Sequence, residues 1–157
     1  MLNEKVISEL QAFIENHIAI KVFNVFEDIL LDNNYNGEIT DFIQTKRKPT
    51  LQKLLFSFID QKGATDPEIY HKAGIDRKLF SKIRSNPTYH PSKQTIIALA
   101  LALELDQEET NTLLNSAGYT LSDSETFDLV IKFCIMKRIY NIHDVNQALE
   151  QYDLKPL

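Results

Sequence analysis

The sequence contains little cysteine, glycine or proline, and each scarcity excludes a class of protein. Cys134 is the only cysteine among 157 residues, so a disulfide within the chain and a metal cluster held by thiolates are both excluded. Four glycines and five prolines, with 43% hydrophobic residues, do not fit a low-complexity or disordered chain. We therefore expect an ordered globular protein.

Long apolar runs and recognisable chemical motifs are also absent. No stretch approaches the roughly 18 uninterrupted apolar residues that cross a membrane, and residues 1–5 lack the features of a secretory signal. The four histidines show no metal-ligand spacing, and no serine or cysteine lies in a known nucleophile motif. The sequence therefore predicts a cytoplasmic protein that binds no metal or cofactor and is not an enzyme.

One segment imitates a calcium-binding loop. Asp32, Asn34 and Asn36 stand at positions 1, 3 and 5 of such a loop, and Gly37 stands at position 6. Position 12, which must supply a bidentate carboxylate, is Ile43. A turn rich in asparagine and glycine accounts for the same residues, and we predict such a turn.

Charge is distributed unevenly along the chain. The net charge of −5 argues mildly against a nucleic-acid partner, because phosphates attract basic surfaces. Residues 71–93, however, hold six basic side chains and one acidic one, a net charge of +5, which leaves −10 for the remainder. The sequence therefore predicts a basic patch on an acidic protein.

Residues 1–44 form an acidic, amphipathic N-terminal region. Its apolar residues recur at helical spacing and comprise Leu2, Val6, Ile7, Leu10, Phe13 and Ile14. Residues 18–31 suit a strand or a helix, and we favour a helix because no partner strand is in view. We expect the apolar stripe to dock on the rest of the chain. A homodimer contact is the alternative, and the acidity also permits a basic protein partner.

A basic run, residues 46–48, precedes Pro49 and marks a boundary. Such a run is either a soluble linker or an arm that contacts phosphates. We favour the linker.

Helix caps divide residues 50–118 into five predicted helices. The expected N-caps of the last four are Thr65, Asp76, Ser92 and Asp106, and Glu68 completes a capping box with Thr65. The glycines that end helices are Gly63, Gly74 and Gly118. Residues 93–105 are nearly all apolar, which predicts a central buried helix. Residues 119–157 add two helices that pack on this core, so the predicted fold is all-α.

The second and third of these helices have the shape of a helix-turn-helix. Gly74 lies in a tight turn, where positive φ is cheap, and the turn allows the third helix to enter a major groove. Phe80 and Ile83 should point inward. The residues expected on the opposite face, and therefore against DNA, are Arg77, Lys78, Ser81 and Lys82. The side chains expected to hold phosphates are Lys72, Arg84, His90 and Lys93.

The pattern resembles a known family. Residues 65–83 (TDPEIYHKAGIDRKLFSKI) are similar to the helix-turn-helix of the XRE family of lambda-repressor/Cro DNA-binding domains, and residues 91–105 are similar to its fourth helix. Residues 121–129 and 139–149 resemble a bacterial subfamily in which the module follows varied N-terminal regions. The resemblance implies a five-helix lambda-repressor-like bundle, with an N-terminal helical leader and two C-terminal helices.

Two residues depart from the family pattern. Tyr70 stands where the family has a small residue, and Ala73 stands where it has a large aliphatic one. This exchange roughly conserves volume, so we expect a repacked but intact motif.

These observations predict a dimeric transcriptional regulator of a bacterium or phage that binds double-stranded DNA sequence-specifically. Two copies would supply the specificity that one short helix lacks. The alternative is a protein-interaction or inhibitory module of phage or bacterial defence that reuses the helix-turn-helix fold.

Overall fold

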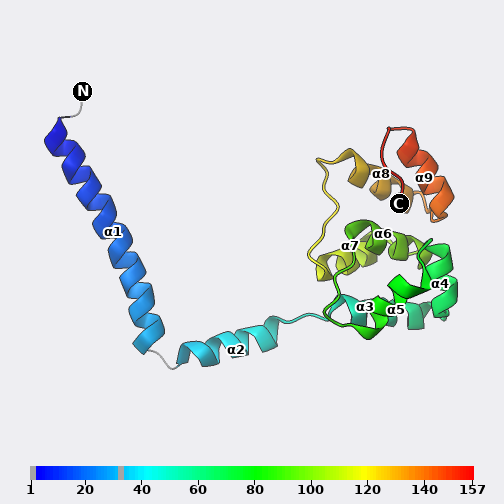
Figure 1. The fold of residues 1–157 in the computed structure, drawn as a ribbon, viewed down its shortest axis with the longest axis horizontal. Coiled ribbons are helices and arrows are strands. Elements are labelled where there is room, and N and C mark those ends of the chain that lie inside the picture. The colour runs from blue at the N-terminus through cyan, green and yellow to red at the C-terminus, as the bar shows by residue number, and fades with distance from the viewer. Residues whose placement is uncertain (1–2, 32–33) are drawn as a thin grey trace. The chain divides into compact units, whose positions relative to one another are not determined.

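A computed structural model describes residues 3–31 and 34–157, with the backbone alone for residues 18–31 and 34–35. Every regular element in these residues is a helix (Figure 1). The all-α prediction is therefore confirmed for the described part of the chain. The chain divides into two compact units, Met1–Arg47 and Lys48–Leu157.

The first unit contains α1 (Glu4–Leu31) and α2 (Asn34–Lys46). The helix favoured over residues 18–31 is confirmed as part of α1. The predicted turn is wrong from Asn34 onward, because these residues are helical; Asp32 lies outside the described residues. Ile39, Phe42 and Ile43 recur at helical spacing, and this periodicity outweighs the roughly 1 kcal/mol that Gly37 costs inside a helix.

The second unit contains seven helices. Their bounds are α3 (Leu51–Lys62), α4 (Asp66–Lys72), α5 (Arg77–Ser85), α6 (Lys93–Ala102), α7 (Gln107–Ser116), α8 (Thr126–Met136) and α9 (Ile142–Glu150). The first five cover the region predicted as a helix-turn-helix module, and the last two are the predicted C-terminal pair.

The predicted helix caps are confirmed. The side chains of Thr65, Asp76 and Asp106 each accept a hydrogen bond from the backbone N–H three residues on. The Glu68 carboxylate accepts one from the Thr65 N–H at 3.0 Å, which completes the capping box. Each such cap contributes about 1 kcal/mol. The sequence thus controls where most helices of this unit begin.

Helix α6 lies at the centre of the second unit and ends earlier than predicted. Ile96 through Leu103 are all buried, and α6 contacts α4, α7 and α9. The helix ends at Ala102, not near residue 105, because Glu104 has a positive φ of 54°. This turn leads the chain directly to Asp106, the cap of α7.

The C-terminal helices share this core. The buried side chains that they contribute are Ile131, Cys134, Ile135, Val145 and Leu149. Helices α8 and α9 pack on each other, α8 contacts α7, and α9 contacts α6 (Figure 1). The core location predicted for Cys134 is confirmed, and burial raises the pKa of its thiol.

Within the described residues, no helix has the length and apolar character that a membrane span requires.

Candidate nucleic-acid interface

Helix α5 separates an apolar inner face from a charged outer face. Phe80 and Ile83 are buried in the core, as the sequence predicted. The four side chains of the outer face are exposed, and they are Arg77, Lys78, Ser81 and Lys82. Because positions i, i+1, i+4 and i+5 lie together on a helix, the structure places these four on one surface, which we call the α5 face.

The turn before α5 is closed by backbone hydrogen bonds. Gly74 has a φ of +67°, and its N–H donates to the His71 carbonyl at 3.1 Å. The next N–H, that of Ile75, donates to the Tyr70 carbonyl at 3.0 Å, in the pattern that commonly ends a helix at glycine. The end of α4 and the start of α5 are therefore held by main-chain contacts.

Aromatic packing holds α5 against α4 and α3. The Tyr70 and Phe80 ring centroids lie 5.6 Å apart, and Phe56 of α3 meets Phe80 edge-on at 6.3 Å. Tyr70 is only partly buried, whereas Ala73 is buried. The large residue thus sits at the rim of the α4–α5 contact and the small one sits inside it, so the exchange that departs from the family pattern is accommodated by packing.

The cations of the α5 face are available to a ligand. Arg77 and Lys78 form no ion pair within the described part of the chain. The Lys82 ammonium lies 5.9 Å from the centroid of the Tyr89 ring, a contact that leaves its charge uncompensated. Three positive charges therefore stand together on a surface of about one and a half helical turns.

Arg84, which was expected to hold phosphate, is engaged within the protein. Its Nε lies 2.7 Å from Asp66 Oδ2, and its Nη2 donates to Asp66 Oδ1 at 2.9 Å. The guanidinium carbon also lies 4.3 Å from the centroid of the Phe56 ring. This bidentate, stacked geometry suits arginine particularly well. Arg84 thus links α5 to α4 and α3, and we assign it a positioning role.

Lys93 is likewise engaged. Its ammonium lies 2.8 Å from both carboxylate oxygens of Asp128, which is buried in α8. The Ser122 N–H donates to the same carboxylate at 2.7 Å. A buried carboxylate requires such compensation, so Lys93 connects α6 to α8. The presence of Asp128 within the apolar run 127–135 is the sequence signal that could have revealed this pair.

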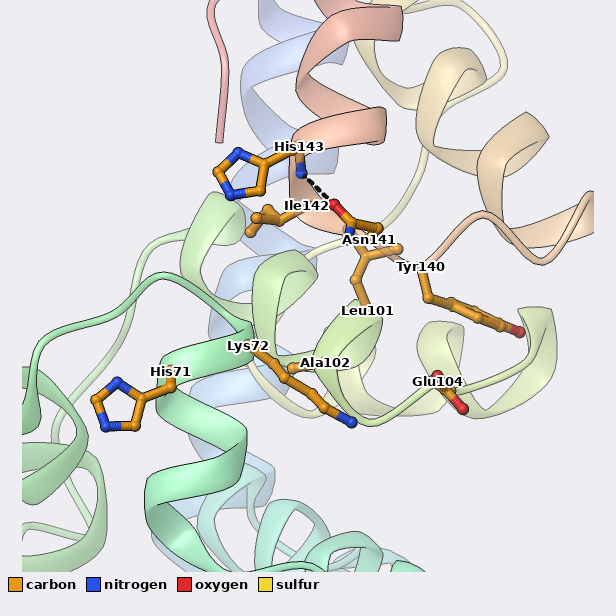
Figure 2. Close-up of a pocket in the computed structure, with 9 residues that line it drawn as sticks. All are labelled: His71, Lys72, Leu101, Ala102, Glu104, Tyr140, Asn141, Ile142 and His143. Carbon is orange, nitrogen blue, oxygen red and sulfur yellow. Dashed lines mark hydrogen bonds between the residues drawn. The ribbon is translucent and has the colours of Figure 1, made fainter.

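Lys72 lies apart from the α5 face. It lines a cavity of about 300 Å³ between α4, α6 and the start of α9, shown in Figure 2. The cavity lining is His71, Lys72, Leu101, Ala102, Glu104, Tyr140, Asn141, Ile142 and His143. None of these described residues belongs to α5. The opposite charges of Lys72 and Glu104 at this opening do not favour an anion.

His90 remains exposed in the loop that follows α5. Its ring lies edge-on to Tyr119 at 6.3 Å, and the Tyr119 hydroxyl donates to the Pro91 carbonyl at 3.1 Å. The loop is therefore anchored to the end of α7, and His90 is positioned beside a fixed ring.

Among the described residues, no cluster of histidine, cysteine or carboxylate side chains has the arrangement of a metal site. Comparison of the chain with models of protein families, with curated proteins and with solved structures finds no match.

Proposed function

We propose that the protein is a helix-turn-helix transcriptional regulator that binds double-stranded DNA with α5 in the major groove. The observation that carries the proposal is the α5 face: three uncompensated cations and a serine on the exposed side of a short helix whose other side is fixed in the core. Major-groove recognition needs an element of this shape and charge. The XRE resemblance of residues 65–83 supports the same function.

The positions along α5 suggest separate roles. The N-terminal part of a recognition helix approaches the base edges, and Arg77 is the first residue of α5. Arginine can donate two hydrogen bonds to guanine, so Arg77 would read a base. Lys78 and Lys82 would contact phosphates, and Ser81 lies between them where it can reach either.

Two copies would bind two half-sites in the cytoplasm of a bacterium or of a phage-infected cell. One helix of nine residues reads few base pairs, whereas a two-fold pair doubles the site and raises its specificity. Because Lys93 and Arg84 are engaged internally, the phosphate contacts fall mainly to Lys78 and Lys82, with His90 beside them in sequence.

Selection from a fragmented genomic DNA pool tests the proposal. The wild-type protein should enrich a defined, roughly symmetric site. The Arg77→Ala, Lys78→Ala, Lys82→Ala variant should lose that site while it stays folded by circular dichroism, because all three side chains are exposed. Failure of folded wild type to bind DNA at low salt would reject the proposal.

A protein-interaction or inhibitory module is the second candidate, favoured by the exposed apolar residues of α1 and its acidic character. In that case the α5 face would be a solvated surface. Capture of arbitrary duplex DNA separates the two functions, because binding through phosphates must weaken steeply as salt is added.

A further inference from the structure

Helix α8 is apolar on both of its sides. Ile131, Cys134 and Ile135 are buried in the core. The outer side carries Leu129, Phe133 and Met136, which are 45%, 52% and 65% exposed. Their spacing of four and three residues places them in one row, which we call the α8 stripe. A helix that is apolar all round is typical of a buried helix, so the α8 stripe is the kind of surface that a partner covers.

The rim of the α8 stripe is basic. Lys132 lies on the helix beside it and is paired with Asp123. Lys137 follows at the C-terminal end, with its ammonium 5.8 Å from the centroid of the Phe133 ring. Arg138 comes next, in a turn of positive φ. An acidic apolar helix would complement this rim.

Helix α1 has that character. Its exposed apolar row, which we call the α1 stripe, comprises Val6, Ile7, Leu10, Phe13 and Ile14. The charged side chains around the row are Glu4, Glu9 and Glu15 against Lys5. Helices in water gain most of their stability from packing an apolar face, so α1 also needs a surface to cover.

We propose that the α1 stripe of one copy packs on the α8 stripe of a second copy, and that the exchange is reciprocal. Charge selects this pairing. Two α1 helices would bring acidic rims together and two α8 helices would bring basic rims together, whereas α1 against α8 brings opposite charges together. Reciprocal exchange closes with two-fold symmetry and leaves no stripe uncovered. The inference concerns how two copies meet, and it stands whether or not α5 binds DNA.

Light scattering after size exclusion tests the pairing without DNA. Wild type should be a dimer. Leu10→Asp and Phe133→Glu should each raise the dimer dissociation constant at least about tenfold, because each places an acidic group in an apolar contact. The matched controls add similar charges at exposed positions away from the stripes: Ser8→Asp on the opposite side of α1, and Ser57→Glu on α3. Both controls should remain dimers. A monomeric wild type would overturn the proposal.

A charge exchange tests the direction of the pairing. Glu9→Lys and Lys137→Glu should each weaken the dimer, and the double variant should recover much of the loss. Failure of that rescue would contradict the assigned complementarity.

Cysteine cross-linking identifies which helices meet. Leu10→Cys and Phe133→Cys proteins that carry different tags should form a mixed disulfide when they are combined and oxidised. Wild type serves as the background, since Cys134 is buried. Efficient self-cross-linking of Leu10→Cys with no mixed product would show pairing of two α1 helices and overturn the proposal. A cross-link confined to a monomer that carries both substitutions would show that α1 covers its own α8, with the same consequence.

Discussion

Helices α5 and α8 belong to the same core but present opposite chemistry to their surroundings. The inner side of each is apolar and buried. Outside, α5 exposes Arg77, Lys78 and Lys82, whereas α8 exposes Leu129, Phe133 and Met136. Clustered cations suit a polyanion, and clustered apolar side chains suit a protein surface. The contrast indicates that the two helices have different partners, and that the basic residues of the chain must be sorted by what each already contacts.

Removal of Lys93 should have the largest effect, because it breaks the attachment of α8. Lys93→Met leaves the buried Asp128 carboxylate without its cation, which typically costs about 3 to 5 kcal/mol of unfolding free energy. Urea denaturation measures the loss. Lys93→Met with Asp128→Leu should recover most of it, since no buried charge then remains. A cost below about 1 kcal/mol for the single variant would show that the pair is unimportant for stability.

Arg77 and Arg84 sharpen the contrast between binding and positioning on α5 itself. Arg77→Ala should lower affinity for the specific DNA site by about 1 to 3 kcal/mol and leave unfolding nearly unchanged, because Arg77 is exposed and contacts no acid among the described residues. Arg84→Ala should reduce stability instead, through lost contacts to Asp66 and Phe56. DNA titrations and thermal melts of both variants check this, and equal effects in both assays would contradict the assigned roles.

Gly74 controls how α5 leaves α4. Gly74→Ala should cost about 1 kcal/mol of stability, because the residue has a φ of +67°, which L side chains rarely adopt. A Cβ there meets no atom within 4 Å, so the cost comes from the backbone alone. Chemical denaturation measures it, with Gly37→Ala in helix α2 as a comparison in which alanine should be favourable. A stabilised Gly74→Ala variant would show that the turn is not fixed as described.

Cys134 probes the inner side of α8 with the smallest expected effect. Burial raises the pKa of its thiol, so the native state holds the neutral form and the reactive thiolate is rare. A thiol reagent at pH 8 should react far more slowly with native than with unfolded protein. The unfolded state ionises first as the pH rises past the ordinary pKa of 9.0, so this group lowers stability slightly at alkaline pH. Fast native labelling would show that α8 opens readily.

Local punctuation of the fold was predictable because it depends on residues close in sequence. Thr65, Asp76 and Asp106 cap helices through bonds that span three residues, and the inward side of α5 follows from periodicity alone. The end of α6 was not predictable in this way, because a positive φ at Glu104 breaks an apolar pattern that continues to Leu105.

Side-chain partners distant in sequence were the main difficulty. Lys93 and Asp128 are 35 residues apart, and Arg84 and Asp66 are 18 apart. A count of charges in the window 71–93 treats Lys93 and Arg84 as free, although tertiary contacts engage them. The exposed α8 stripe was also missed. The apolar residues at 129, 133 and 136, added to those at 131, 134 and 135, were the available signal.

The salt dependence of DNA binding tests the central claim most directly. Affinity for one duplex would be measured over a range of salt concentrations, for wild type and for the Arg77→Ala, Lys78→Ala, Lys82→Ala variant. Each phosphate contact contributes about 0.9 to the slope of log affinity against log salt. The account predicts a steep slope for wild type that falls by about 2 in the variant, since Lys78 and Lys82 are assigned to phosphates. Equal slopes for the two folded proteins, or no binding by wild type at low salt, would contradict it.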